Sequence, residues 1–153
     1  MASNRHLGRI VALQTLYEFE FRTQCEDSTV NVDEILTRNL SRYESAIQDK
    51  EFVSGLVKGV IQAQSGLDEK LQPIAPDWPL DQIARVDRSI LRLGLYELLF
   101  EAEKVPPKVA INEAVELAKA FGSANSSKFI NGVLGTAYRT LVEENESSAK
   151  SEV

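Results

Sequence analysis

The stretch VPPKVAINEAVELAKAFG, residues 105–122, has the features of one complete amphipathic helix together with its two boundaries. Pro106 and Pro107 interrupt whatever precedes it, because proline lacks a backbone N–H and restricts the residue before it. Apolar residues then recur three or four positions apart, which places them on one face of a helix. They are Ile111, Ala114, Val115 and Ala118. Gly122 suits the left-handed conformation that commonly follows a helix end, so we expect the helix to end at Phe121.

The same helical spacing recurs along the rest of the chain, and no alternating pattern typical of a β-strand competes with it. Glycine and proline are sparse, with 8 and 5 residues in 153. We therefore expect an all-α protein of about seven helices. Besides the one ending at Phe121, they cover about 4–22, 33–45, 50–71, 80–85, a segment opened by Asp87, and a last helix that contains Phe129. The Asp87 carboxylate is expected to cap the amides of Ser89 or Ile90.

A proline-rich stretch, QPIAPDWP at residues 72–79, separates two halves of the chain. Three prolines within eight residues prevent a helix from continuing through it. We predict one helical domain over 1–142, with subdomains at about 1–72 and 79–142 joined by this linker. Trp78, inside the linker, is either part of a recognition surface or a plug at the edge of a core.

The acidic charge of the chain is unevenly distributed. The formal net charge is −6, and nucleic-acid binding depends largely on cations that contact phosphates. However, residues 143–153 contain four acids and one base, a net −3, and have almost nothing to bury, so we expect a disordered acidic tail. Residues 119–142 contain no acid, and Arg5, His6 and Arg9 precede the first acid, Glu18. Two small basic regions are thus hidden by an acidic average.

The composition leaves little room for catalysis or for a cofactor. Cys25 and His6 are the only cysteine and histidine, which argues against a disulfide, a metal site and a Cys–His pair. Glu113 and Glu116 could form a carboxylate pair, but such glutamates more often form a solvated helix face. We expect no enzymatic activity. No apolar run is long enough for a secretory signal or a membrane span, so we expect a cytoplasmic protein.

Several blocks of the sequence closely resemble the NusB family of bacterial transcription antitermination factors. The two longest are VPPKVAINEAVELAK at residues 105–119 and SKFINGVL at residues 127–134. ALQTLY at 12–17 and ILRLGLYEL at 90–98 add to the match, which spans about residues 5–140. The resemblance implies an all-α fold of two small helical bundles packed at an angle.

The resemblance also implies a function. In the family, the protein and a small ribosomal-subunit protein, NusE, bind the boxA element of nascent RNA. They join RNA polymerase and other Nus factors and suppress premature termination, chiefly in ribosomal RNA operons. Single-stranded RNA is bound by base stacking and by hydrogen bonds to base edges on a cationic support.

The resemblance assigns RNA contacts to two segments of this sequence. They are Arg5, His6 and Arg9 at the start, and Asn125, Ser127, Lys128 and Phe129 later. Family members often begin with an unbroken arginine cluster, whereas Leu7 and Gly8 interrupt this one. We therefore expect weak RNA binding by the chain alone, strengthened by its basic partner. Asp81 and Asp87 are the expected partner-facing acids, with helix N-capping as the competing explanation for both.

A second function stays open, namely a protein-interaction or dimerisation module of NusB-like fold with little RNA binding of its own. The first predicted helix has an apolar stripe formed by Ile10, Leu13, Leu16, Tyr17 and Phe21. This stripe would serve a homodimer, but it is equally what an intramolecular core requires.

Overall fold

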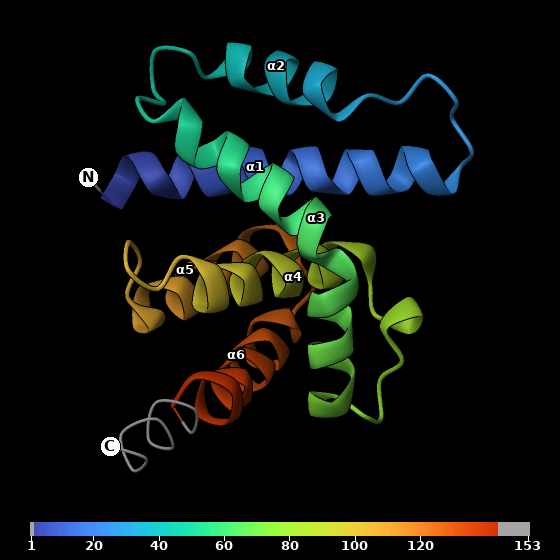
Figure 1. The fold of residues 1–153 in the computed structure, drawn as a ribbon, viewed down its shortest axis with the longest axis vertical. Coiled ribbons are helices and arrows are strands. Elements are labelled where there is room, and N and C mark those ends of the chain that lie inside the picture. The colour runs from blue at the N-terminus through green and yellow to red at the C-terminus, as the bar shows by residue number, and fades with distance from the viewer. Residues whose placement is uncertain (1, 144–153) are drawn as a thin grey trace. The chain divides into compact units, whose positions relative to one another are not determined.

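The computed structural model describes residues 2–143, and within that range every regular element is helical. This confirms the predicted all-α class. The six α-helices are α1 (Ala2–Gln24), α2 (Val32–Arg42), α3 (Lys50–Ile74), α4 (Arg85–Phe100), α5 (Pro107–Phe121) and α6 (Ser126–Ala137). A 3-10 turn, η1 (Leu80–Gln82), and a π-helical segment, η2 (Tyr138–Glu143), complete the set (Figure 1). Beyond Glu143, the predicted acidic tail lies outside the described residues.

Contacts within the chain divide it into two compact units, residues 1–62 and residues from 63 onward. The division falls inside α3, and the proline-rich stretch 72–79 belongs to the second unit. Helix α3 continues to Ile74 and includes Pro73, a few residues further than the spacing of its apolar residues predicts. Pro73 has no N–H to donate to the carbonyl four residues earlier, and α3 ends one residue after it, as expected for a residue that interrupts helices. No helix in the described part of the chain is long and apolar enough to cross a membrane.

In the first unit, α2 lies alongside α1 (Figure 1). Asn39 of α2 donates a hydrogen bond to the Thr15 hydroxyl of α1 at 3.0 Å, and both residues are buried. The start of α3 lies close to α1 as well, because a Cβ added at Gly8 would stand 3.0 Å from Val53 Cγ2. Asp49 caps α3, since its carboxylate accepts the Phe52 N–H at 3.0 Å.

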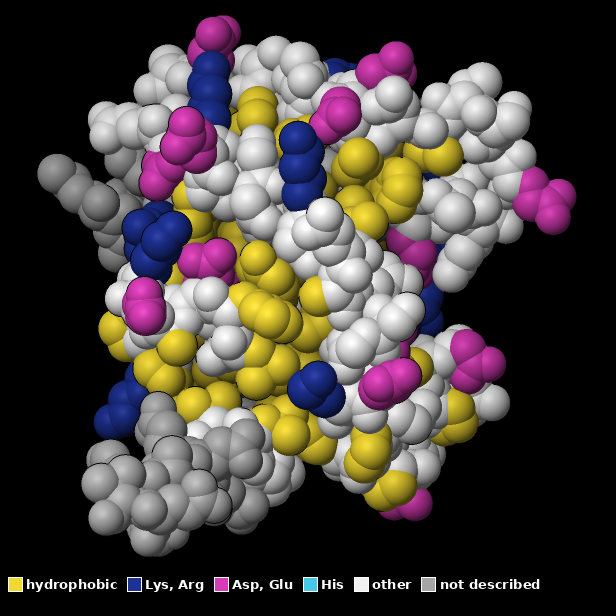
Figure 2. All heavy atoms as spheres, viewed as in Figure 1, with side chains coloured by type: hydrophobic (Ala, Val, Ile, Leu, Met, Phe, Trp, Pro, Cys, Tyr) yellow, Lys and Arg dark blue, Asp and Glu magenta, His cyan; other side chains and the backbone are white. Residues whose placement is uncertain are grey.

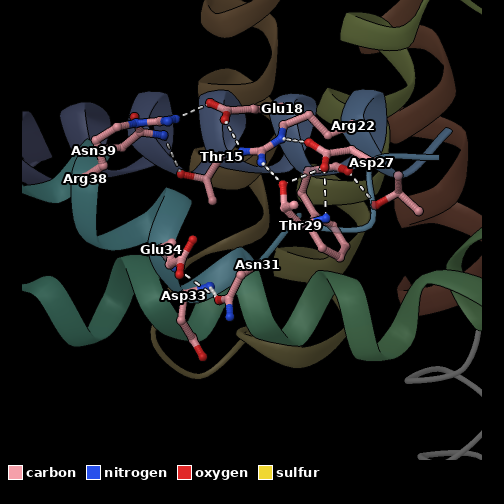
Figure 3. Close-up of polar contacts among 12 residues, drawn as sticks. Thr15, Glu18, Arg22, Asp27, Thr29, Asn31, Asp33, Glu34, Arg38 and Asn39 are labelled. Carbon is pink, nitrogen blue, oxygen red and sulfur yellow. Dashed lines mark hydrogen bonds and ion pairs between the residues drawn. The ribbon is translucent and has the colours of Figure 1, made fainter. Parts of the chain in front are cut away.

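A polar network joins the C-terminal end of α1 to the following loop and to α2 (Figure 3). Arg22 contacts Glu18 at 3.1 Å and Asp27 at 2.8 Å, and Arg38 also donates to Glu18. Burial raises the pKa of Glu18, but hydrogen bonds from Arg38 and Arg22 outweigh it, so its pKa lies below the usual value. Hydrogen bonds from Thr29 and Arg22 lower the pKa of Asp27 to about 2.

The apolar stripe expected on the first helix is only partly buried. Leu13 and Leu16 are in the core, but Tyr17 is 39% exposed and Phe21 is 46% exposed. An intramolecular core therefore accounts for Leu13 and Leu16 but leaves much of the surface of these two aromatic residues exposed. The core of the unit also includes Val11 and Ala12, which precede Leu13. The buried face of α1 is therefore rotated slightly about the helix axis, relative to the face that carries the apolar stripe.

In the second unit, α4, α5 and α6 pack against one another (Figure 1). Gly94 allows α4 to approach α6, since a Cβ at this position would stand 2.6 Å from Leu134 Cδ1 and 3.3 Å from Ala114 Cβ. The buried side chains are mostly branched aliphatic residues. They include Ile90, Leu91, Leu95, Leu98, Leu117, Ile130 and Leu134.

Two local predictions in this unit are wrong. Helix α4 begins at Arg85 after Ala84, so Asp87 lies within the first turn and is not the N-cap. Gly122 has φ −93° and ψ −171°, an extended and not a left-handed conformation. Glycine is needed there for space, because a Cβ would stand 2.6 Å from Ser126 Cβ and 2.8 Å from the Ala118 carbonyl oxygen.

Candidate nucleic-acid interface

The segment 125–129, to which RNA contacts are assigned by resemblance, lies at the start of α6. Asn125 precedes the helix, and its side chain makes no capping hydrogen bond. Asn125 and Lys128 are exposed, while Ser127 and Phe129 are half-buried. The segment thus presents an amide, an ammonium group and a partly accessible aromatic ring on one helical turn, where the helix dipole adds a partial positive charge.

Buried hydroxyl contacts hold this segment in place. The Ser126 hydroxyl accepts the Ser123 N–H at 2.9 Å and donates to Asp87 Oδ2 at 3.0 Å. Gly122 leaves room for Ser126, because any larger residue would place its Cβ against the Ser126 side chain. The connection between α5 and α6 is therefore fixed to the first turn of α4 by residues that are themselves buried, which orders the adjoining exposed groups.

The ring of Phe129 faces an exposed tryptophan. The Trp78 and Phe129 ring centroids are 6.4 Å apart, with an angle of 72° between the ring planes. Trp78 is 58% exposed, which favours its interpretation as a surface group over that of a core plug. Sequence reasoning noted Trp78 but did not connect it to Phe129, because only the fold brings these two residues together.

A cavity of about 360 Å³ opens beside these two rings, and we call it the Trp78–Phe129 cavity. Its lining combines the two aromatic rings with polar groups. They include Gln82, Asp87, Ser123, Asn125 and Ser126. The volume lies in the range of about 300–1,000 Å³ that is typical of small-ligand sites. Gln82 was not predicted from the sequence.

The two predicted partner-facing acids differ in accessibility. Asp81 lies in η1 and is exposed, whereas Asp87 is 9% exposed and lines the cavity. N-capping explains neither residue, because η1 follows Pro79 and α4 follows Ala84 without a side-chain cap.

The predicted N-terminal RNA segment, residues 5–9, lies on α1 in the first unit. The guanidinium carbons of Arg5 and Arg9 lie 4.9 and 5.3 Å from the centroid of the Phe52 ring. Such cation–π contacts orient both side chains. Arg5 and His6 are half-buried, while Arg9 is only 2% exposed. In the structure, Arg5 and Arg9 therefore both lie against the Phe52 ring. Phe52 belongs to this site but was not predicted from the sequence.

Comparison with known proteins gives a consistent assignment. The family model described as the NusB family matches residues 6–139. The chain belongs to the NusB family. A transcription antitermination protein NusB from Chloroflexus aggregans is 44% identical over 149 residues, which is 97% of this chain and 95% of the relative. The NusB from Roseiflexus castenholzii is 44% identical over 137 residues, covering 89% of this chain and 92% of that relative.

Solved NusB structures share the fold. That of T. maritima NusB has a TM-score of 0.78 at 33% identity and covers 89% of this chain and 91% of its own. A structure of the antitermination factors NusB and NusE in complex with dsRNA has a TM-score of 0.78 at 26% identity, covering 91% and 98%. The family model takes in the segment 125–129 and all but the first residue of the segment 5–9.

Charge on the surface is mixed. On the face drawn in Figure 2, basic and acidic side chains are interspersed and neither sign forms a continuous patch.

Within residues 2–143, no three His, Cys, Asp or Glu side chains converge to hold a metal ion. Glu116 pairs with Lys119 at 3.4 Å on the surface of α5, which agrees with a solvated helix face.

Proposed function

We propose that this chain is a transcription antitermination factor that binds boxA-type RNA of nascent transcripts together with NusE. In this role it helps to assemble the antitermination complex on RNA polymerase, chiefly on ribosomal RNA operons. Its relatives are named transcription antitermination proteins at up to 44% identity over most of the chain. A structural neighbour is NusB in complex with NusE and dsRNA. The role is non-catalytic and is exercised in the cytoplasm.

The proposal rests mainly on the arrangement of side chains at the start of α6. Lys128 and Phe129 are adjacent there, on a turn held in place by the Ser126–Asp87 hydrogen bond. A cation beside an accessible aromatic ring is the combination that single-stranded RNA requires, since the cation contacts phosphate and the ring stacks on a base. Lys128 makes no ion pair within the described residues, so its charge is available to a phosphate.

The N-terminal segment supports the same role less strongly. Arg5 and His6 are partly accessible, whereas Arg9 is buried. We propose that Arg5 and His6 contact the RNA backbone, while the buried Arg9 packs against Phe52 and has a structural role. A reduced cationic surface of this kind agrees with weak binding by the chain alone.

The exposed carboxylate of Asp81 supports an interaction with a basic partner. Such a group attracts a cationic protein and adds to the association rate. Asp87 is too deeply buried to act as a surface charge, so Asp81 alone of the two acids is proposed to face the partner.

The proposal is tested by fluorescence titration of a labelled boxA oligonucleotide at several salt concentrations, with and without NusE. For the wild type, the logarithm of the association constant should fall linearly with the logarithm of the salt concentration. Lys128→Glu should lower affinity and reduce the magnitude of this slope by about 0.7. Lys108→Glu is the matched control, because Lys108 is also an exposed lysine but lies in the first turn of α5. This turn is about 20 Å along the helix from its C-terminal end, which leads into the segment 125–129.

Two results would contradict the proposal. One is RNA binding that is independent of salt or unaffected by both Lys128→Glu and Arg5→Glu. The other is a complex with NusE that forms normally but does not bind the oligonucleotide, which would favour the protein-interaction module. A duplex of the same sequence serves as a second probe, and we expect it to bind more weakly because its paired bases cannot reach Phe129.

A further inference from the structure

Helix α3 belongs to both compact units, because the division between residues 62 and 63 falls within it. Each half of the helix has its own buried side chains. They are Val53, Leu56, Val57 and Val60 in the first half, and Leu67 and Leu71 in the second. None of the residues between them, 61–66, is buried. Nearly two turns of α3 therefore have no core side chain that fixes them to either unit.

This connecting stretch, 61–66, ends with Ser65 and Gly66. After proline, glycine is the residue that most destabilises the interior of a helix. Packing does not require glycine here, because a Cβ at Gly66 would meet nothing within 4 Å, whereas a Cβ at Gly94 would stand 2.6 Å from Leu134 Cδ1. Gly/Ser pairs are among the few sites where helices bend sharply. The pair thus weakens α3 where side-chain packing supports it least.

On each side of the stretch, α3 is held by a different unit. Val53 packs against α1, since a Cβ at Gly8 would stand 3.0 Å from Val53 Cγ2. Asp68, two residues after Gly66, forms an ion pair with Arg92 of α4 at 2.8 Å. Hinges between domains consist of a few residues that absorb the change in backbone angles. Any bending of α3 is therefore concentrated in residues 61–66.

The two segments proposed to contact RNA belong to different units. Residues 5–9 are part of α1, and Arg5 and Arg9 lie against Phe52 in the first half of α3. Residues 125–129 are at the start of α6 in the second unit. A change in the angle of α3 would therefore change the distance between two segments that one RNA strand has to contact.

We propose that residues 61–66 form a hinge centred on Gly66, and that bending of α3 there adjusts the spacing of the two RNA-contacting segments. The hinge follows from the packing of α3, whereas its use in RNA binding rests on the proposed function. RNA that contacts both segments selects one of the angles that the hinge allows. The loss of conformational entropy opposes binding, which agrees with weak binding by the chain alone.

Distances between two spin labels measure the hinge directly. Cys25, the only cysteine of the chain, is exposed in the first unit. Asn112→Cys adds a second label at an exposed position of α5 in the second unit. Double electron–electron resonance then gives the distribution of distances between the units. The control pair combines Cys25 with Thr37→Cys on α2, so both labels lie in the first unit. We expect a wider distribution for the inter-unit pair.

Gly66→Ala should remove most of the excess width, because alanine favours the helical conformation. Gly55→Ala is the matched control. Gly55 also lies inside α3, and a Cβ there would also meet nothing within 4 Å, but it belongs to the first unit. Both substitutions should raise the melting temperature by a similar amount. Only Gly66→Ala should narrow the inter-unit distribution.

Hydrogen exchange measured by NMR gives a second readout. The amides of residues 65–70 donate to carbonyls of the stretch 61–66, four residues earlier in the helix. Their protection factors in the wild type should be lower than those of residues 55–60, because local opening is easier where few side chains are buried. Gly66→Ala should raise the protection of residues 65–70, and Gly55→Ala should leave it unchanged.

Three results would overturn the hinge. They are an inter-unit distribution as narrow as that of the control pair, a wide one that Gly66→Ala leaves unchanged, and equal narrowing by Gly66→Ala and Gly55→Ala. Addition of a boxA oligonucleotide to the complex with NusE should narrow the wild-type distribution. RNA binding without such narrowing would overturn the role of the hinge in RNA binding. If the complex binds no RNA, the proposed function fails, whereas the label distances in the free protein still decide whether the hinge exists.

Discussion

Arg92 of α4 binds both carboxylate oxygens of Asp68 in α3, with Nε 2.8 Å from Oδ1 and Nη2 2.9 Å from Oδ2. The Arg92 side chain is 9% exposed and that of Asp68 is 27% exposed. A pair with two parallel hydrogen bonds and little access to water is stronger than a surface ion pair. It attaches the C-terminal half of α3 to the helix bundle of the second unit.

The first prediction concerns this pair. Asp68→Asn should lower the free energy of unfolding by about 1–3 kcal/mol, because a nearly buried guanidinium loses its charged acceptor. Lys58→Gln is the control, since Lys58 and Asp33 are both exposed and 3.5 Å apart, and it should change stability by no more than about 0.5 kcal/mol. Urea denaturation measures both. Equal effects of the two substitutions would contradict the role given to Asp68.

The second prediction concerns the close approach at Gly94. Gly94→Ala should destabilise the protein by about 1–3 kcal/mol, because its Cβ would collide with Leu134 in a packed core. In Gly132→Ala the added Cβ meets nothing within 4 Å, and this helical substitution should stabilise by about 0.5–1 kcal/mol. Thermal melting compares the two variants, and a stabilised Gly94→Ala would show that α4 and α6 are not in close contact.

The third prediction concerns the buried hydrogen bond between α1 and α2. Asn39→Ala should lower the free energy of unfolding by about 2 kcal/mol, because it removes the amide that donates to the buried Thr15 hydroxyl and leaves a void, although this hydroxyl still donates to the Val11 carbonyl oxygen. Asn131 is exposed on α6, and Asn131→Ala should have an effect within about 0.5 kcal/mol. Denaturant midpoints provide the comparison. A mild Asn39→Ala would indicate that water replaces the amide.

The fourth prediction is a dependence of stability on pH. The pKa of Asp27 is about 2 in the folded protein, against 3.8 for the unperturbed group. Its contribution is therefore fully present above pH 3.8 and is lost as the pH falls to about 2. Asp27→Asn should make the acid-induced loss of stability shallower in this window. Ser28→Ala, at the neighbouring exposed position, removes no titratable group and should follow the wild-type curve. Identical curves for all three proteins would refute the assignment.

The fifth prediction uses Trp78 as a probe, since it is the only tryptophan. Binding of boxA RNA should change its fluorescence, because a base stacked on Phe129 would lie close to the indole, whose ring centroid is 6.4 Å from that of Phe129. Phe129→Leu should weaken RNA binding about tenfold through loss of stacking. Phe121→Leu is the control, as Phe121 is 41% exposed at the end of α5 and does not line the cavity. RNA binding without any change in the Trp78 signal would place the base elsewhere.

The helices and their ends follow largely from local sequence. Spacing of three or four residues reflects the helical period and therefore needs no tertiary information. Thus α5 ends at Phe121 as predicted, and Asp49 caps α3. The prediction of an N-cap failed at Asp87 because its carboxylate bonds to Ser126, which is 39 residues away.

For the candidate site, the sequence by itself determined which segments have the necessary chemistry. Lys128 and Phe129 are neighbours in the chain, so the sequence alone places a cation beside an aromatic ring. The tertiary structure decided that Trp78 and Asp87 lie with Phe129 around one cavity. It also decided that Tyr17 is exposed and Arg9 is buried. The physical reason is that helical periodicity specifies the faces of a helix, whereas the contacts between distant helices depend on how those faces pack.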